Sequence, residues 1–370
     1  MPVRFGFSTF LITNLNMYTI GTLAPGDESQ YRNFVDAHPQ GTLHYGLKYR
    51  SLLDQLLPNS DSIYLLAREA GQIVGVLPTF IKRSRKGNIL NSLPFYGSHG
   101  GALTAGEPSQ ACDVKRLLLK QAQELAVAEK CLVSTIVAPL FDNDPIVYEE
   151  ELSCDFRDSR IGQVTFLPAP GPDLDDRLLS AFHSKTRNMV RKAYKSDIEW
   201  RTSDSESDLR FLADIHMENS AAIGIVAKGR EFFSLVPRIF TYGRDYQVYV
   251  ATKNGENIAA LLLFYHNTTV EYFTPCIVER HRSLQPMSLL IFEAMKQAIS
   301  NGFRSWNWGG TGHGLEGIYR FKKRWGATDL VYNYYTQKHG DLRPILELGK
   351  SGILDEYKYF YAVPFSLFDQ

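Results

Sequence analysis

The stretch from Phe303 to Gly326 holds the residue types best suited to chemistry. Its glycines are Gly309, Gly310, Gly312 and Gly314. Because glycine permits positive φ and close backbone approach, N–H groups of this stretch could line a site for a carbonyl or phosphate oxygen. A helical pattern containing Lys322 follows. A fixed positive charge beside such a loop could stabilise negative charge that develops in a transition state.

Two interpretations of Lys322 are open. Leu315, Ile318, Lys322 and Trp325 recur at helical spacing, which places the lysine on an apolar stripe. In the first interpretation its stem covers apolar surface while the ammonium reaches water. In the second, the ammonium reaches into a cleft beside the glycines and acts on a substrate. Position in the sequence does not separate the two.

Residues Gly312 to Gly317 spell G-x-G-x-x-G between an expected strand and an expected helix, as in a dinucleotide-binding turn. A dinucleotide fold requires several further strand–helix units after that turn. The rest of the chain is short and begins with a Tyr-rich strand expected at Thr328–Gln337. The sequence therefore argues against a dinucleotide site.

A basic segment, His183–Ser196, is a second candidate for ligand binding. It follows a proline-rich stretch, and Arg187 and Arg191 share one face of the helix expected there. The segment could be a solvated cationic surface. Alternatively, Lys185, Arg187, Arg191 and Lys192 could converge on phosphates next to a domain boundary, where ligand clefts often form.

Composition limits the functions that the chain can have. It has 370 residues with 44% hydrophobic content, enough for two domains. Lys and Arg total 40 and Asp and Glu total 40, so the formal net charge is zero and no DNA-binding surface is expected. The cysteines, Cys112, Cys131, Cys154 and Cys276, lack metal-binding spacing. We expect a reduced, cytoplasmic protein without a metal, a redox cofactor or any tightly bound cofactor.

The N-terminus does not resemble a targeting segment. The apolar run Phe5–Ile12 is interrupted by Ser8 and is followed by polar residues without a cleavage site, so we expect an early strand. No apolar run approaches the roughly 20 residues that a membrane-spanning helix needs. A soluble protein is expected.

The order hairpin, strand, helix, strand occurs twice. Tyr64–Phe80 aligns without gaps on Val248–Phe264 and matches Gly71 with Gly255. The other helices expected are at Ser29–His38, Tyr45–Leu57, Val114–Lys130 and Ser288–Asn301. The other strands expected are at Cys131–Ala138, at Arg304–Trp308 and along Ile89–Leu103, the last broken by Gly97, Gly100 and Gly101. We predict a mixed α/β fold with two copies of one domain, each a mostly antiparallel mixed sheet flanked by helices.

The join between the copies is expected where Pro168, Pro170, Gly171 and Pro172 interrupt the pattern. The predicted domains are 1–165, for the acceptor side, and 166–340, which carries the basic segment and Lys322. Residues 341–370 are expected to form a tail that packs back on the domains.

Two motifs resemble the Fem family, peptidyltransferases built from two tandem GNAT-like acyltransferase domains. They are R-N-x-x-R-K-A at Arg187–Ala193 and W-N-W-G-G…G-I-Y-R-F-K-K-R-W-G at Trp306–Gly326, and Ser92–Gly101 also fits. The resemblance covers most of the chain. It implies that a cell-envelope or polysaccharide precursor binds in a cleft between the domains, and that its amine attacks an acyl group delivered by aminoacyl-tRNA.

The resemblance also implies roles for individual residues. Lys322 would be catalytic, and Phe321 would border the acyl site. The residues expected to bind substrate are Arg187, Asn188, Arg191, Phe321, Tyr96, Gly310 and Gly312. A lipid-linked substrate would bring the protein to the membrane surface as a peripheral enzyme.

The acyl donor stays open, either aminoacyl-tRNA or acyl-CoA, because the long helical hairpin of some Fem proteins is missing. An acetyl-CoA-dependent N-acetyltransferase acting on a sugar or small amine is an alternative. Its pyrophosphate loop would fall at Arg280–Met287, where Ser283 and Gln285 replace glycines and Pro286 removes an N–H donor. A non-catalytic binding module is the other alternative. His99, His183 and His313 are candidate general bases, none of them certain.

Overall fold

A computed structural model describes residues 17–95, 99–141, 145–312 and 315–368. The strand expected at Phe5–Ile12 and the candidate residues Tyr96 and His313 lie outside these ranges. The chain forms two compact units. The first contains Met1–Arg50, Leu57–Ser159 and Tyr332–Gln370, and the second contains Ser51–Leu56 and Arg160–Val331.

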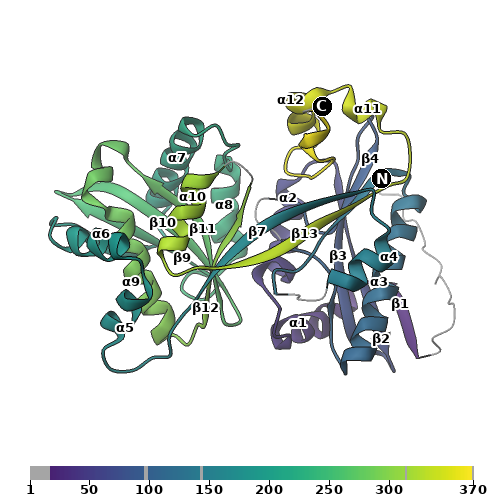
Figure 1. Ribbon diagram of the computed structural model, residues 1–370, viewed down its shortest axis with the longest axis horizontal. Helices are drawn as coiled ribbons and strands as arrows, with labels where there is room; N and C mark the ends of the chain where they lie inside the picture. Colours follow the sequence, from purple (N-terminus) through teal and green to yellow (C-terminus); the bar gives the residue numbers. More distant parts are fainter. Residues whose placement is uncertain (1–16, 96–98, 142–144, 313–314, 369–370) are drawn as a thin grey trace. The chain divides into compact units, whose positions relative to one another are not determined.

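The first unit is built on a mixed sheet. Its strands, in spatial order, are β1 (Tyr18–Thr22), β2 (Ser60–Glu69), β3 (Gln72–Lys82), β4 (Asn88–Asn91), β6 (Cys131–Val137) and the end of β13 (Thr328–Lys338), with β5 (Leu103–Thr104) beside β3 (Figure 1). Only the β4–β6 pair is parallel. The helices in the N-terminal part of the chain are α1 (Glu28–Ala37), α2 (Leu47–Leu56), α3 (Pro108–Ala128) and α4 (Pro145–Leu152), and residues Ser51–Leu56 of α2 are assigned to the second unit.

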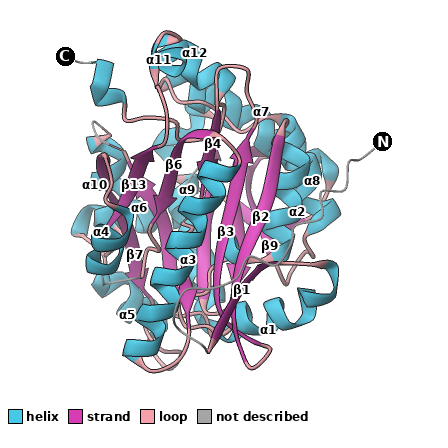
Figure 2. Ribbon diagram, turned by 90° about the vertical axis from the view of Figure 1, so that its right-hand side faces the viewer, coloured by secondary structure: helices cyan, strands magenta, loops and turns pink. Residues whose placement is uncertain are grey.

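The long helix α3 covers one face of β2, β3 and β6 (Figure 2). Val114, Leu118 and Ala122 recur every four residues and are buried, so they form one apolar stripe. They pack with Leu65 of β2 and Leu77 of β3 in a single core cluster. The apolar faces of the strands and of the helix thus pack together in one core.

The C-terminal residues add a smaller core to the first unit. Helices α11 (Arg343–Leu346) and α12 (Gly349–Glu356) follow β13. Ile345 and Ile353 pack with Ile89 of β4 and Val133 of β6. Short 3₁₀ turns lie at Pro25–Asp27, Leu43–Tyr45, Glu279–Leu284 and Phe365–Phe368.

The second unit also contains mixed β-structure. Its strands, in spatial order, are β7 (Phe156–Phe166), β12 (Ser305–Thr311), β11 (Thr269–Ile277), β10 (Glu256–His266), β9 (Tyr246–Lys253) and β8 (Glu199–Ser203). Only β11 and β12 run parallel. The helices are α5 (Leu174–Ala181), α6 (Ser184–Tyr194), α7 (Glu206–Ala222), α8 (Arg230–Ile239), α9 (Pro286–Ser300) and α10 (Glu316–Arg324) (Figure 1).

The predicted mixed α/β fold is confirmed. The two segments aligned in the sequence are the hairpins β2–β3 and β9–β10. Each sheet is mostly antiparallel, and helices pack on it. Within the described ranges, no helix is long and apolar enough to cross a membrane.

The strand predicted at Ile89–Leu103 is wrong over most of its length. Of the described residues in this stretch, only Asn88–Asn91 and Leu103–Thr104 are strands. Beyond β4, the backbone at Gly100 and Gly101 packs too tightly for side chains. A Cβ on Gly101 would lie 2.3 Å from Pro139 Cδ, so the apolar composition here reflects a buried loop, not a sheet.

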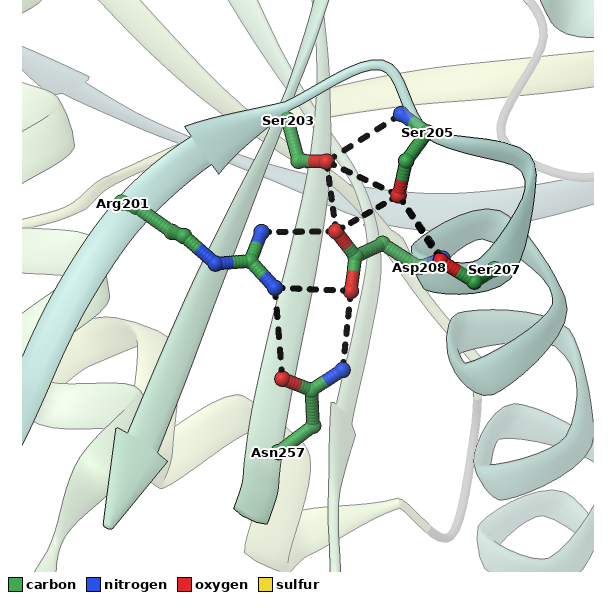
Figure 3. Close-up of polar contacts among 6 residues, drawn as sticks. All are labelled: Arg201, Ser203, Ser205, Ser207, Asp208 and Asn257. Atoms are coloured by element: carbon green, nitrogen blue, oxygen red, sulfur yellow. Dashed lines mark hydrogen bonds and ion pairs between the residues drawn. The ribbon is translucent and has the colours of Figure 1, made fainter. Parts of the chain in front are cut away.

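A polar network fastens helix α7 to the sheet of the second unit (Figure 3). Asp208, in the first turn of α7, accepts two hydrogen bonds from Arg201 of β8, at 2.6 and 2.9 Å, and one from Asn257 of β10, at 2.8 Å. Ser203 and Ser205 also donate to this carboxylate. Because one buried side chain bonds two strands, the network fixes the start of the helix against the sheet.

Candidate functional site

The parallel strands β11 and β12 diverge partway along their length. Thr269, Val270 and Glu271 pair with Ser305, Trp306 and Asn307, and the pairing ends there. Beyond this point β12 pairs with β7 at Gly310 and Thr311, while β11 continues beside β10 to Ile277. The divergence opens a gap in the sheet after Glu271.

A cavity of about 670 Å³ lies at this gap, and all of its lining residues belong to the second unit. Helix α7 and the segment after it contribute His216, Asn219, Ser220, Ile223, Ile225 and Lys228. Strand β11 contributes Tyr272, Phe273, Pro275, Cys276 and Ile277. The other sides include Met189, Arg282, Gln285, Met287, Ser288, Trp308, Gly317, Ile318, Phe321 and Lys322. Most of this wall is apolar, as is usual for small-molecule sites.

Where β11 leaves β12, a side chain from α7 provides hydrogen-bond partners for backbone groups of β11. The Asn219 amide donates to the carbonyl of Ile277 at 3.0 Å and accepts from its N–H at 2.9 Å. A side-chain amide thus replaces the neighbouring strand, as buried backbone groups require. This contact holds the gap open at its wide end.

Lys322 is only 5% exposed and lies against the cavity. Its ammonium donates to the carbonyls of Gly309 and Gly310, both at 3.1 Å, and to the Thr311 hydroxyl at 2.9 Å. That hydroxyl donates its own proton to Gln163, so it acts as an acceptor toward Lys322. Burial lowers the pKa of Lys322 to about 7. The interpretation that the ammonium reaches bulk water is wrong.

Gly309 and Gly310 belong to strand β12 and do not form an open loop. Strand β12 continues to Thr311, and Gly310 pairs with Gly162 of β7. The N–H of Gly309, which has a φ of 72°, donates to the Asn307 side chain. The expectation that N–H groups of this segment face a ligand is therefore wrong at Gly309. Its carbonyl faces Lys322 instead.

Glu271 and Asn307 form a buried pair where the strands separate. Asn307 donates to Glu271 Oε2 at 2.8 Å, and no partner is found for Oε1 among the described residues. Burial raises the pKa of Glu271 to about 8, although the hydrogen bond from Asn307 opposes this shift. Asn307 also accepts from Gly309, whose carbonyl accepts from Lys322. Hydrogen bonds thus connect the carboxyl group to the catalytic candidate.

We expect Glu271→Gln to remove a pH dependence of stability. Because the folded pKa of Glu271 is raised to about 8, the unfolded chain loses this proton first as the pH rises from about 4.5. The wild-type free energy of unfolding should therefore fall, relative to the variant, between pH 5 and 8. Urea titrations of both proteins across this range measure the difference. A constant difference would contradict a buried, protonated Glu271.

The residues of the basic segment predicted to bind substrate, Arg187, Asn188 and Arg191, lie on helix α6 and differ in their exposure. Arg187 is half-buried and donates to the carbonyl of Phe182 at 2.6 Å, while Asn188 and Arg191 are exposed. None of the three lines the cavity, although Met189 from the same helix does. Phe321 and Lys322 do line it. Gly310 and Gly312 are not among its described lining residues, and their binding roles stay predictions.

Two of the candidate histidines, His99 and His183, are not among the described lining residues of the cavity. His183 caps helix α6 by accepting from the N–H of Lys185. His99 is buried in the first unit, where desolvation lowers its pKa to about 3. His216, which the sequence did not indicate, lies in the cavity wall. Burial and the nearby charge of Lys228 lower its pKa to about 4.

Cys276 is a cavity thiol that the sequence did not mark as functional. Burial raises its pKa to about 12. The thiolate is the reactive form of cysteine, so this side chain is not an activated nucleophile at neutral pH.

Comparisons with known proteins identify the fold. The acetyltransferase (GNAT) domain family matches residues 180–323. The crystal structure of FemX has a TM-score of 0.67 at 15% identity, covering 89% of this chain and 99% of FemX. A tandem GNAT protein from the clavulanic acid biosynthesis pathway has a TM-score of 0.52 at 12% identity, covering 88% and 99%. L-PGS from Bacillus licheniformis has a TM-score of 0.52 at 12% identity, covering 85% and 97%.

No match was found among curated proteins. The matched domain contains helices α6 to α9 and ends within α10, so it includes the diverging strands and Lys322. Residues 180–323 therefore match the acetyltransferase (GNAT) domain family, and the chain shares its fold with FemX and with the tandem GNAT protein.

Proposed function

We propose that this GNAT-type acyltransferase forms an amide by transferring an acyl or aminoacyl group to the amine of a cell-envelope or polysaccharide precursor. The observation that carries the proposal is the cavity where β11 leaves β12, with Lys322 in its wall. The separated strands provide an apolar enclosure, and the lysine provides a positive charge. The resemblance of the motifs at Arg187–Ala193 and Trp306–Gly326 to the Fem family supports an envelope precursor as the acceptor.

In this reaction the acceptor amine attacks the carbonyl carbon of the donor. The C–N bond forms, and negative charge develops on the carbonyl oxygen. Collapse of this intermediate breaks the C–O bond of an ester or the C–S bond of a thioester, and the leaving group departs with its electron pair. The amine proton passes to the leaving group or to water.

Lys322 supplies the charge that stabilises this intermediate. Its Nζ faces three acceptors and no donor, an arrangement that suits an ammonium with three N–H groups. The three bonds fix the position of the charge before the reaction begins. A preorganised charge in an apolar enclosure stabilises a developing oxyanion more than a mobile one does.

Aminoacyl-tRNA is our first proposal for the donor, because the fold resembles that of FemX. A second candidate is acetyl-CoA, since the structure of the tandem GNAT neighbour is that of the form without acetyl-CoA. The start of α9 favours this candidate, since Met287 and Ser288 line the cavity near a helix N-terminus. Pro286 in the first turn weakens it, because proline has no N–H to donate to a phosphate.

We expect Arg191→Ala to weaken binding of a phosphorylated donor by about tenfold or more, since a charge-assisted hydrogen bond contributes roughly 1.5–3 kcal/mol. The effect should shrink at high salt because Arg191 is exposed. Arg210→Ala is the matched control, since Arg210 is an exposed helical arginine paired with Glu206. Filter binding of charged tRNA and calorimetry with coenzyme A measure the loss. Unchanged affinity for both would assign Arg191 to a solvated surface.

The proposed function is tested by incubating the purified protein with charged tRNAs or acetyl-CoA and a panel of amine acceptors. Mass spectrometry of the acceptors should show an added acyl or aminoacyl mass with one donor class. If Lys322→Met forms the same product at the same rate, the reaction does not use this site. If neither donor acylates an acceptor, the proposed function is wrong.

A further inference from the structure

Besides His216, the described part of the cavity wall contains three basic side chains, those of Arg282, Lys322 and Lys228. They differ in how many of their N–H groups already have an acceptor in the protein. Arg282 is exposed and pairs with Glu279. Lys322 donates all three of its N–H groups to β12. Lys228 has neither a carboxylate partner nor a full set of acceptors among the described residues. It is therefore the cation with donors available to a ligand.

Lys228 is held at the cavity by β11 and α7. Its ammonium lies 3.4 Å from the carbonyl of Phe273 and 5.0 Å from the centre of that ring. Its backbone N–H donates to His216 Nε2 at 3.2 Å, so the neutral imidazole carries its proton on Nδ1. Burial lowers the pKa of Lys228 to about 8. These contacts fix the lysine and leave at least one N–H unused.

The charges around Lys228 indicate which kind of ligand group would accept its remaining N–H groups. No Asp or Glu is found among the described lining residues. Lys228 is half-buried, and a ligand anion would pair with its ammonium more favourably than the apolar wall does. One available cation matches the single charge of a carboxylate. A phosphate dianion would leave negative charge unpaired in an apolar wall.

Lys228 also lies on a particular side of the sheet. The Phe273 ring, which it contacts, stacks on Phe232 of α8. Tyr272, the next residue of the strand, contacts Trp306 and Trp308 in the core that includes α9. Because Phe273 packs on α8 and Tyr272 packs against the core that includes α9, Lys228 and the start of α9 border the cavity from opposite sides. Two substrates could thus enter from different sides.

We propose that Lys228 binds a carboxylate of the acceptor, so that the acceptor is an amine carrying a carboxylate, such as an amino acid or a peptide end. Assigning this anion to the acceptor rests on the proposed function, with the donor at the α9 face. The carboxylate subsite itself rests on the contacts of Lys228. An apolar wall that includes Phe273, Ile223 and Ile225 would contact the rest of the ligand.

The test uses phenylacetate, phenylacetamide and phenylphosphonate as probes of the whole protein, with dissociation constants from ligand-detected NMR. Wild type should bind phenylacetate at least about tenfold more tightly than phenylacetamide, as expected for a charge-assisted contact. Lys228→Met should abolish this preference, and Lys228→Arg should restore part of it. Lys323→Met is the control and should keep the preference. The preference should fall as the pH rises through about 8.

Equal binding of phenylacetate and phenylacetamide to wild type would overturn the proposal, and this comparison does not depend on any variant folding. Tighter binding of phenylphosphonate than of phenylacetate would overturn the choice of a carboxylate. A preference that survives Lys228→Met would assign it to another residue. If the carboxylate preference is found but no donor acylates any amine, the subsite stands and the proposed function alone fails.

Discussion

Lys322→Met should lower the turnover number by about 10²–10³, the loss expected when one preorganised electrostatic group is removed. Methionine keeps an unbranched apolar stem and deletes the charge. The acceptors on Gly309, Gly310 and Thr311 would lose their donor, and the developing oxyanion would lose its stabilising charge. Single-turnover rates of amide formation with the donor identified by mass spectrometry measure this effect.

Lys323→Met is the matched control for this experiment. Lys323 is the next residue of α10, but it is exposed and lies 3.4 Å from Asp329. We expect its turnover to stay within about twofold of wild type, since a surface ion pair contributes little. Equal losses from both substitutions would indicate a general need for positive charge and would contradict a specific role for Lys322.

The pH dependence separates catalysis by Lys322 from a purely structural role. Its pKa is about 7, and its charged form is the one that stabilises an oxyanion. The wild-type turnover number should therefore fall as the pH rises above about 7. The turnover number of Lys322→Met should not show this fall. Titration of the acceptor amine affects both proteins equally and cancels in the ratio of their rates.

Asp208→Asn should produce a large loss of stability, about 3 kcal/mol, because removing one partner of a buried ion pair leaves the others unsatisfied. The Asp208 side chain is 5% exposed and Arg201 is 45% exposed, so the lower end of the usual range applies. The asparagine NH₂ group would also face donors from Asn257 and the serines. For a unit of this size the thermal midpoint should fall by about 6–12 °C.

Asp214→Asn, on the same helix, is the control, because Asp214 forms an exposed pair with Arg230. Acid should reproduce the effect of Asp208→Asn. Burial alone would raise the pKa of Asp208, but hydrogen bonds from Arg201, Ser203, Ser205 and Asn257 hold it well below its usual range. Its stabilisation is therefore present above about pH 4 and is lost as the pH falls below that value. Differential scanning calorimetry at pH 7 and pH 3 measures both effects, and equal losses for the two variants would contradict this account.

The elements that the sequence predicted well are those with a clear period. The alternation in Tyr64–Phe80 and Val248–Phe264 identified two hairpins, and the helical spacing from Leu315 to Trp325 placed Lys322 on the inner face of α10. Both inferences depend on local patterns of apolar residues. These patterns identified Lys322, a charged residue of the cavity wall, but they did not predict the cavity itself.

The rest of the site depends on contacts between distant segments. A glutamate within a strand usually indicates a solvent-facing position, but helices cover both faces of β11, so Glu271 is buried. Strand β12 continued through Gly309 and Gly310 because β7 pairs with it. Lys228 follows α7 in an irregular segment, and no pattern relates it to Phe273. These features arise from the divergence of β11 and β12, which no local spacing encodes.

The central claim is that the reacting acyl group occupies the cavity where these strands diverge. Crosslinking measures this directly, with a diazirine placed in the acyl chain of an acyl-CoA and of an aminoacylated 3′-terminal nucleotide, followed by peptide mapping. For the donor that supports transfer, we predict crosslinks to Tyr272–Ile277, to Met287 and Ser288, or to Phe321, and their loss on competition with unlabelled donor. Competable crosslinks confined to the first unit would contradict the assignment of this cavity as the acyl-transfer site.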